Sequence, residues 1–228
     1  MAVGAIVFDL DWTLYDADTF YDAAWRRVAA HVAGATGQPA DVLTNLLVHV
    51  WKQQGPSCPD LFDRWTERAA LPAQPWVQTA IDVLHGDWRV GLAPYPGVIA
   101  LLRGLSDVSL GLLTEGRTAT QRRKLDALGL DSFFDSIVVS EEIGTRKSTG
   151  KPYAEICRRL GVEPRQTLSV GDRFDSDVVP PAALGAMTCL VRQGPFAARP
   201  APRGADWQID HVAALRPIVR QWQVERAR

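Results

Sequence analysis

Cysteine is scarce in this sequence, and its three cysteines, Cys58, Cys157 and Cys189, lie far apart without forming a CxxC pair. The four histidines are equally scattered, so we expect neither a zinc site nor a disulfide framework. Reduced thiols are typical of a cytoplasmic protein. No run of about 18 apolar residues is present, and the first residues lack a basic segment, so we expect no membrane span and no signal peptide.

An excess of charge is also absent: 25 Lys and Arg residues stand against 26 Asp and Glu residues, for a formal net charge of -1. Proteins that bind nucleic acid polymers or anionic membranes non-specifically rely on excess positive charge, so we expect neither partner. The apolar share of 46% is typical of a globular protein and excludes global disorder. The 228 residues suit one large domain or a core with an insertion.

Short apolar segments, each followed by a turn and a helix-like segment, recur along most of the chain. They are apolar on both faces, which is typical of strands covered by helices on both sides. Strands that alternate with helices predict a doubly wound parallel sheet of the α/β class. The predicted strands are 5–8, 108–113, 136–139, 167–170 and 187–191, and helices are predicted at 97–102, 118–128 and 152–160.

Residues 15–93 interrupt this alternation and contain no convincing strand. Helical segments are predicted there at 16–35, 40–53, 60–70 and 75–88. We therefore expect an α/β core of residues 1–14 and 94–228 and an inserted helical lid of residues 15–93. Five of the eight tryptophans fall in this insertion, where they form its core or, for one or two of them, line the substrate cleft; they are Trp25, Trp51, Trp65, Trp76 and Trp88.

Acidic residues follow two of the predicted strands. Asp9 and Asp11 belong to a DxDxT segment directly after the first strand, and Asp172 follows the strand at 167–170. Ligands of such sheets bind at the carboxyl ends of strands, and a carboxylate there is a hard oxygen ligand for Mg²⁺. A surface turn with a helix cap is the alternative interpretation of DxDxT. Asp177 either orders its loop or caps the next helix, and Asp175 is interpreted as a solvated loop acid.

Together with Thr114 and a lysine, these segments resemble the four motifs of the haloacid dehalogenase-like hydrolase superfamily. The resemblance covers nearly the whole chain outside the helical insertion. The insertion itself is similar to the helical cap that one phosphatase branch carries between its first and second motifs. The resemblance implies a Rossmann-like core with a cap that closes over the site and determines the substrate.

The resemblance also implies a role for each matching residue. Asp9 would attack phosphorus to form an aspartyl-phosphate, while Asp11 would protonate the leaving alcohol and later activate water. Mg²⁺ would be held by Asp9, by the backbone carbonyl of Asp11 and by Asp172. Thr114 would hydrogen-bond a phosphate oxygen, and Asp177 would order its loop.

Two lysines are candidates for the third motif. Lys151 belongs to a Lys-Pro pair that opens a helix, as is frequent in the superfamily. The pattern Glu-Glu-hydrophobic-Gly-x-x-Lys instead selects Lys147, and the spacing from Lys147 to Tyr153 and to Asp172 then matches without a gap. We favour Lys147 as the catalytic lysine and keep Lys151 as the alternative.

Two residues depart from the superfamily pattern. Glu115 stands where this branch usually has Asn, and a carboxylate near phosphate is repulsive unless it points away or pairs with Arg117 or a lysine. We hypothesise that Glu115 faces out of the pocket. Trp12 stands where a small or polar residue is common, and we expect it to pack beneath the cap and narrow the entrance.

The predicted function is a Mg²⁺-dependent phosphatase that acts on a small phosphorylated metabolite: a nucleoside monophosphate, phosphoglycolate or a sugar phosphate. Dehalogenases of the superfamily lack the second aspartate of the first motif, so Asp11 favours phosphate chemistry. A sugar-phosphate mutase and a non-catalytic scaffold are the alternatives. We expect a cytoplasmic monomer or homodimer.

Overall fold

The computed structural model describes residues 4–55, 58–86, 88–197 and 203–226, and it divides the chain into two compact units. The first unit, called the core unit, comprises Met1–Ala17 and Gly91–Arg228. The second, called the helical unit, comprises Asp18–Val90. These divisions lie near the boundaries predicted from the sequence, whereas the action of the helical unit as a cap stays a prediction.

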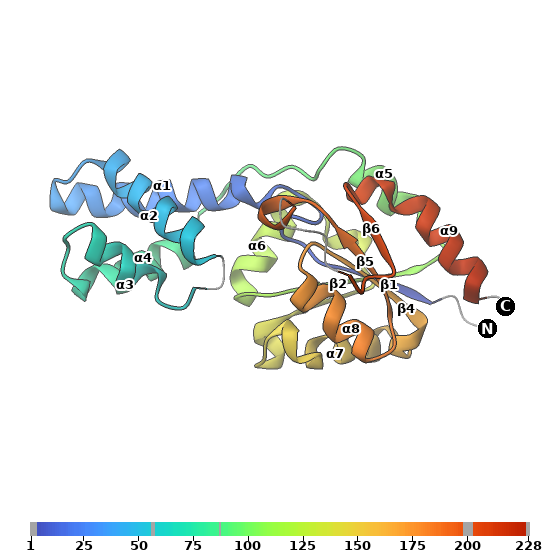
Figure 1. The fold of residues 1–228 in the computed structure, drawn as a ribbon. Helices are drawn as coiled ribbons and strands as arrows, with labels where there is room; N and C mark the ends of the chain where they lie inside the picture. Colours follow the sequence, from blue (N-terminus) through green and yellow to red (C-terminus); the bar gives the residue numbers. More distant parts are fainter. Residues whose placement is uncertain (1–3, 56–57, 87, 198–202, 227–228) are drawn as a thin grey trace. The chain divides into compact units, whose positions relative to one another are not determined.

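The core unit contains a parallel sheet of six strands in the order β3-β2-β1-β4-β5-β6, which confirms the predicted fold class (Figure 1). The order reverses between β1 and β4, and ligands of such sheets bind at the carboxyl ends of strands at this point. The sixth strand was not predicted, because it is only three residues long and follows a stretch rich in proline and arginine. The strands are β1 (Ala5–Phe8), β2 (Ser109–Thr114), β3 (Ser136–Val139), β4 (Thr167–Gly171), β5 (Met187–Val191) and β6 (Trp207–Ile209).

Helices cover both faces of this sheet: α7 and α8 lie on one side, and α5 and α9 lie on the other (Figure 1). Helix α7 packs against the centre of the sheet, where Tyr153 and Ile156 join Val7, Leu113 and Val138 in a buried cluster. The helices are α5 (Val98–Arg103), α6 (Thr118–Leu128), α7 (Lys151–Leu160), α8 (Val179–Ala183) and α9 (Leu215–Arg226), with one-turn helical segments at Asp131–Phe133, Ser140–Ile143, Lys147–Thr149, Pro164–Gln166, Phe174–Val178, Gly194–Phe196 and Val212–Ala214.

The helical unit consists of α2 (Ala40–Gln54), α3 (Leu61–Arg68), α4 (Ala73–His85) and nearly all of α1 (Ala17–Thr36). Aromatic rings form its core: Trp25 contacts Tyr21, Trp51 and Phe62, and the ring nitrogen of Trp65 donates to the Leu43 carbonyl at 2.9 Å. Trp25, Trp51 and Trp65 therefore contribute to the packing of this unit, and whether another of its tryptophans lines the substrate cleft stays a prediction.

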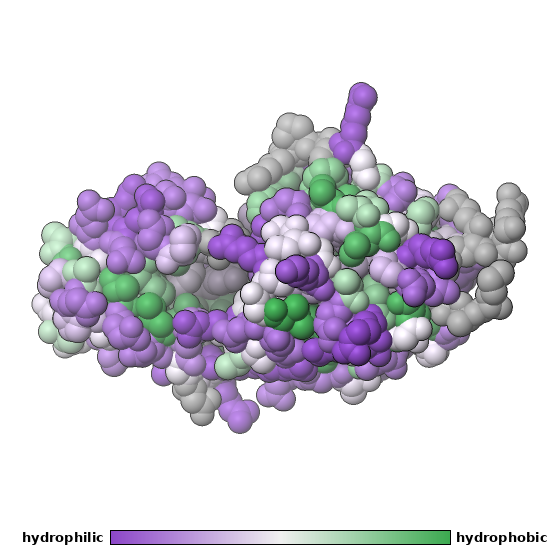
Figure 2. Space-filling view, turned by 90° about the horizontal axis from the view of Figure 1, so that it is seen from below, coloured by the Kyte–Doolittle hydropathy of each residue, from purple (hydrophilic) through white to green (hydrophobic). Residues whose placement is uncertain are grey.

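The visible face of the molecule is largely hydrophilic, and its hydrophobic side chains stand in small separate groups (Figure 2). The described large hydrophobic residues that are well exposed are Val42, Val179 and Leu184. Among the described residues, no helix combines the length and the apolar character that crossing a membrane requires.

Candidate active site

Asp9 stands at the carboxyl end of β1, where the strand order reverses. Its backbone N–H donates to the Val170 carbonyl at 2.9 Å, so the hydrogen bonding between β1 and β4 extends as far as this residue. Its carboxylate is buried, with Lys147 Nζ 2.6 Å from Oδ1 and the Thr13 hydroxyl 3.3 Å from Oδ2. The short strand and its neighbours thus hold this side chain in one place.

Lys147 lies between two carboxylates: its Nζ is 2.6 Å from an oxygen of Asp9 and 2.6 Å from an oxygen of Asp177. Burial by itself lowers the pKa of this amine, but the two carboxylates more than offset that effect and raise it above its ordinary value. Lys147 is therefore a cation. Lys151, the alternative candidate, is exposed at the first position of α7. The structure thus brings Lys147 to Asp9 and leaves Lys151 at the surface.

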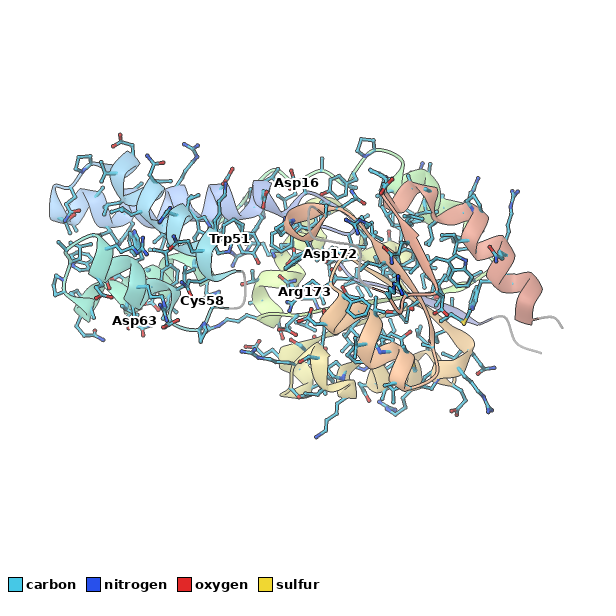
Figure 3. The ribbon with its side chains drawn as sticks, in the orientation of Figure 1. Asp16, Trp51, Cys58, Asp63, Asp172 and Arg173 are labelled. Carbon is cyan, nitrogen blue, oxygen red and sulfur yellow. The ribbon has the colours of Figure 1, made fainter. Side chains whose placement is uncertain are left out.

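Three buried carboxylates, those of Asp9, Asp172 and Asp177, gather within 4.8 Å of one another. Burial raises the pKa of Asp9 to about 7; Lys147 lowers it in part, while Asp177 raises it. Burial and the nearby charges of Asp9 and Asp177 also raise the pKa of Asp172 well above its usual range. Asp172 lies beside Arg173 in the loop that follows β4 (Figure 3).

This carboxylate cluster fits a divalent metal ion. Oδ2 of Asp172 is buried without a hydrogen-bond partner, and Lys147 supplies only one positive charge among the three carboxylates. Mg²⁺ prefers one or two carboxylates together with waters and phosphate oxygens. Asp172, with its unpartnered oxygen, and the neighbouring Asp9 would hold the ion, while Asp177 is bonded to Lys147 and to the Arg173 backbone N–H. The predicted contribution of the Asp11 backbone carbonyl stays a prediction.

Asp177 holds the loop after β4 in place. Its carboxylate accepts from the Arg173 backbone N–H at 3.0 Å, and its own backbone carbonyl accepts from the Ser169 hydroxyl at 2.7 Å. Gly171 makes this arrangement possible, since a Cβ there would meet the Asp177 side chain. Asp175, interpreted from the sequence as a solvated acid, is exposed but pairs with Arg173 at 2.8 Å.

Asp11 is held by three side chains of the core unit. Lys124 Nζ lies 2.8 Å from both carboxylate oxygens, the Tyr15 hydroxyl donates at 2.6 Å, and Gln121 Nε2 donates at 3.3 Å. None of these three residues was predicted from the sequence to have a role in the site. A signal was present: polar Gln121 and Lys124, three residues apart, share a helical face with apolar Leu125 and Leu128.

Thr114, the last residue of β2, is buried, and its hydroxyl accepts a short hydrogen bond from Gln121. The neighbouring Glu115 is only partly exposed, and its carboxylate accepts from the backbone N–H of Lys147 at 2.9 Å. The hypothesis that Glu115 faces out of the pocket stays a prediction. Its hydrogen bond ties the carboxylate to the backbone of the segment that carries Lys147.

Trp12 is 3% exposed and has a positive φ of 55°, a left-handed conformation that is uncommon for a large residue. Its side chain packs closely against Gly194, where a Cβ would clash with it. The lack of a side chain at Gly194 therefore makes room for the ring. The predicted packing of Trp12 beneath the cap stays a prediction.

Comparisons with known proteins identify the family of this chain. Residues 3–185 match the haloacid dehalogenase-like hydrolase family. The chain is 34% identical to the glyceraldehyde 3-phosphate phosphatase of Methanopyrus kandleri over 96% of this chain and 98% of that one. It is 30% identical to the plasmid phosphoglycolate phosphatase of Cupriavidus necator, over 92% and 90% of the two chains.

A solved structure has the same fold. The HAD phosphatase of Thermococcus onnurineus superimposes with a TM-score of 0.70 at 22% identity, over 95% of this chain and 97% of that one. The family match spans most of the sequence, and the curated relatives align over nearly their full length. The chain belongs to the haloacid dehalogenase-like hydrolase family and is a hydrolase of phosphoric monoesters.

Proposed function

We propose that this protein is a Mg²⁺-dependent phosphatase that hydrolyses a small phosphorylated metabolite through an aspartyl-phosphate on Asp9. The observation that carries the proposal is the position of Asp9: it is buried at the switch point of the sheet, beside the cation of Lys147 and the unpartnered oxygen of Asp172. A carboxylate in such surroundings can act as a nucleophile once positive charge offsets its repulsion from phosphate.

In the first half-reaction an oxygen of Asp9 attacks phosphorus and the ester bond to the leaving alcohol breaks. Bound Mg²⁺ would supply positive charge that keeps Asp9 ionised and offsets the charge of the phosphate. Lys147 adds a second positive charge at 2.6 Å from Asp9, and the Thr114 hydroxyl donates a hydrogen bond to a phosphate oxygen. Positioning and charge dominate phosphoryl transfer, so these groups account for most of the catalysis.

Asp11 serves both half-reactions. As a general acid it delivers a proton to the leaving oxygen, and as a general base it takes a proton from the water that hydrolyses the aspartyl-phosphate. Its place two residues after Asp9 brings a second carboxyl group to the same end of the sheet.

Glyceraldehyde 3-phosphate is the first substrate to test, because the relative of that name matches this chain over nearly its whole length. Phosphoglycolate, a sugar phosphate and a nucleoside monophosphate complete the panel. The helical unit acts as the cap that selects among them. The described cysteines are free thiols, which suits the reducing cytoplasm.

The test is phosphate release from this panel and from p-nitrophenyl phosphate, with and without Mg²⁺. Asp9→Asn removes the nucleophile with little change in shape, and Asp175→Asn makes the same chemical change at an exposed site. We expect Mg²⁺-dependent release that Asp9→Asn abolishes and Asp175→Asn preserves. Equal activity of Asp9→Asn and the unmodified protein would refute the proposal. An isomerised sugar phosphate without free phosphate would identify a mutase instead.

A further inference from the structure

The side chain of Lys124 is unusual for a lysine on a helix, because it is 1% exposed and reaches Asp11 with its amine. Lysines are rarely fully buried unless they are paired. Here the ammonium group lies 2.8 Å from each of the two oxygens of Asp11. A buried cation in this geometry is stabilised by a carboxylate that carries a negative charge.

Two further donors contact Asp11. The Tyr15 hydroxyl donates to Oδ1 at 2.6 Å, and Gln121 Nε2 donates to Oδ2 at 3.3 Å. Each of these neighbours donates to an oxygen of Asp11, so together they fix the orientation of its carboxylate.

Gln121 also connects Asp11 to the phosphate-contacting residue. Its amide nitrogen donates to the Thr114 hydroxyl as well as to Asp11. The reverse orientation of the amide would place its oxygen against the carboxylate of Asp11, which is unfavourable. The Thr114 oxygen therefore accepts from Gln121, and its own hydrogen is directed to another acceptor such as a phosphate oxygen.

We propose that Lys124 is a positioning residue that holds Asp11 as the base of the second half-reaction, with Gln121 aligning Asp11 and Thr114 with each other. The inference rests on the proposed function. In this step the oxygen of water bonds to phosphorus, and the bond between phosphorus and Asp9 breaks. One proton passes from the water to Asp11, Asp9 leaves as a carboxylate, and phosphate is released.

The two half-reactions can be separated with p-nitrophenyl phosphate. Nitrophenolate is a good leaving group, so formation of the aspartyl-phosphate from it depends little on a general acid. Hydrolysis of the aspartyl-phosphate still depends on the base. A defect in positioning Asp11 as a base should therefore slow turnover more than it slows the first release of nitrophenol.

The experiment is rapid mixing of this substrate with unmodified protein, Lys124→Met and Arg122→Met in Mg²⁺. Met keeps much of the length of Lys and removes its charge. Arg122→Met removes a cation from the same helix at an exposed position that pairs with Glu142. For Lys124→Met we expect a burst of nitrophenol at nearly the normal rate. A steady rate about 10- to 100-fold lower should follow, with phosphorylated protein visible by intact mass. Arg122→Met should behave as the unmodified protein.

An unchanged steady rate in Lys124→Met would overturn the inference. Equal slowing of burst and steady rate, without phosphorylated protein, would overturn it in favour of a purely structural role. If circular dichroism shows that Lys124→Met is unfolded, the burst and the steady rate of Gln121→Met are measured instead and judged by the same criteria. Failure of the proposed function is distinct: the unmodified protein would then release no more nitrophenol than Asp9→Asn.

Discussion

Gly171→Ala is expected to damage both stability and activity, because the side chain of Asp177 occupies the space that a methyl group would need. The new Cβ would lie 2.6 Å from the Asp177 Cβ and closer still to its carboxylate. Carbon atoms in contact lie about 3.5–4.0 Å apart, so Asp177 must move by about 1 Å. Asp177 cannot move freely, since it is buried and bonds to Lys147 at 2.6 Å and to the Arg173 backbone at 3.0 Å.

Inserting a methyl group into a packed interior costs about 1–3 kcal/mol. With an m value of about 2 kcal/mol/M, a loss of about 2 kcal/mol lowers the urea midpoint of the core unit by about 1 M. The movement also shifts Lys147 relative to Asp9. A misplacement of about 1 Å can lower turnover by about 100-fold.

The assay is urea unfolding followed by circular dichroism, together with hydrolysis of p-nitrophenyl phosphate. Circular dichroism is preferred to fluorescence, because five of the eight tryptophans lie in the helical unit. Gly91→Ala is the matched control, since a Cβ at Gly91 meets nothing within 4 Å. The reasoning is refuted if Gly171→Ala matches Gly91→Ala in both unfolding midpoint and turnover.

Two further predictions concern the charges of the site. Glu115→Gln retains an oxygen that can accept from the Lys147 N–H, so its turnover should change by less than about threefold. Glu115→Ala loses this acceptor and should lower turnover further. Equal turnover of the two variants would contradict a role for Glu115 in holding the Lys147 backbone. The second prediction follows from the raised pKa of Asp9, about 7. Its protonated form stabilises the metal-free fold below about pH 4, and this contribution is lost as the pH rises through about 7. In EDTA, the Tm of the unmodified protein should therefore fall over this pH range more steeply than the Tm of Asp9→Asn. Added Mg²⁺ should raise the Tm of the unmodified protein most above pH 7. Parallel plots of Tm against pH for the two proteins would count against a buried, proton-binding Asp9.

The sheet could be predicted because its strands are continuous apolar runs that end in turns, and a strand buried on both faces leaves that pattern in the sequence. Strand β6 was not predicted from the sequence. Its three residues are too few to show a pattern, and Gln208 within it is exposed. It joins the sheet because β5 presents an open edge for pairing.

Some residues of the candidate site could also be predicted from the sequence, and others could not. Asp9, Asp11 and Asp172 could be named because each follows a predicted strand, and parallel strands deliver their ends to one edge. Lys124 was not predicted as a site residue, because a polar residue on a helix is ordinarily exposed, and its place on the apolar face of its helix was the one sequence signal against that. Only the folded chain buries Lys124 and brings it to Asp11, across more than one hundred residues of sequence.

The α/β class, the place of the helical insertion and the acidic residues at the strand ends can be predicted from sequence alone, because these depend on local periodicity and on spacing along the chain. Which lysine lies beside Asp9, what Glu115 binds and which side chains surround Asp11 are visible only in the folded chain. Those outcomes depend on distances between residues far apart in the sequence. Burial makes these pairings necessary, since a charge removed from water is costly unless it is paired with an opposite charge or hydrogen-bonded.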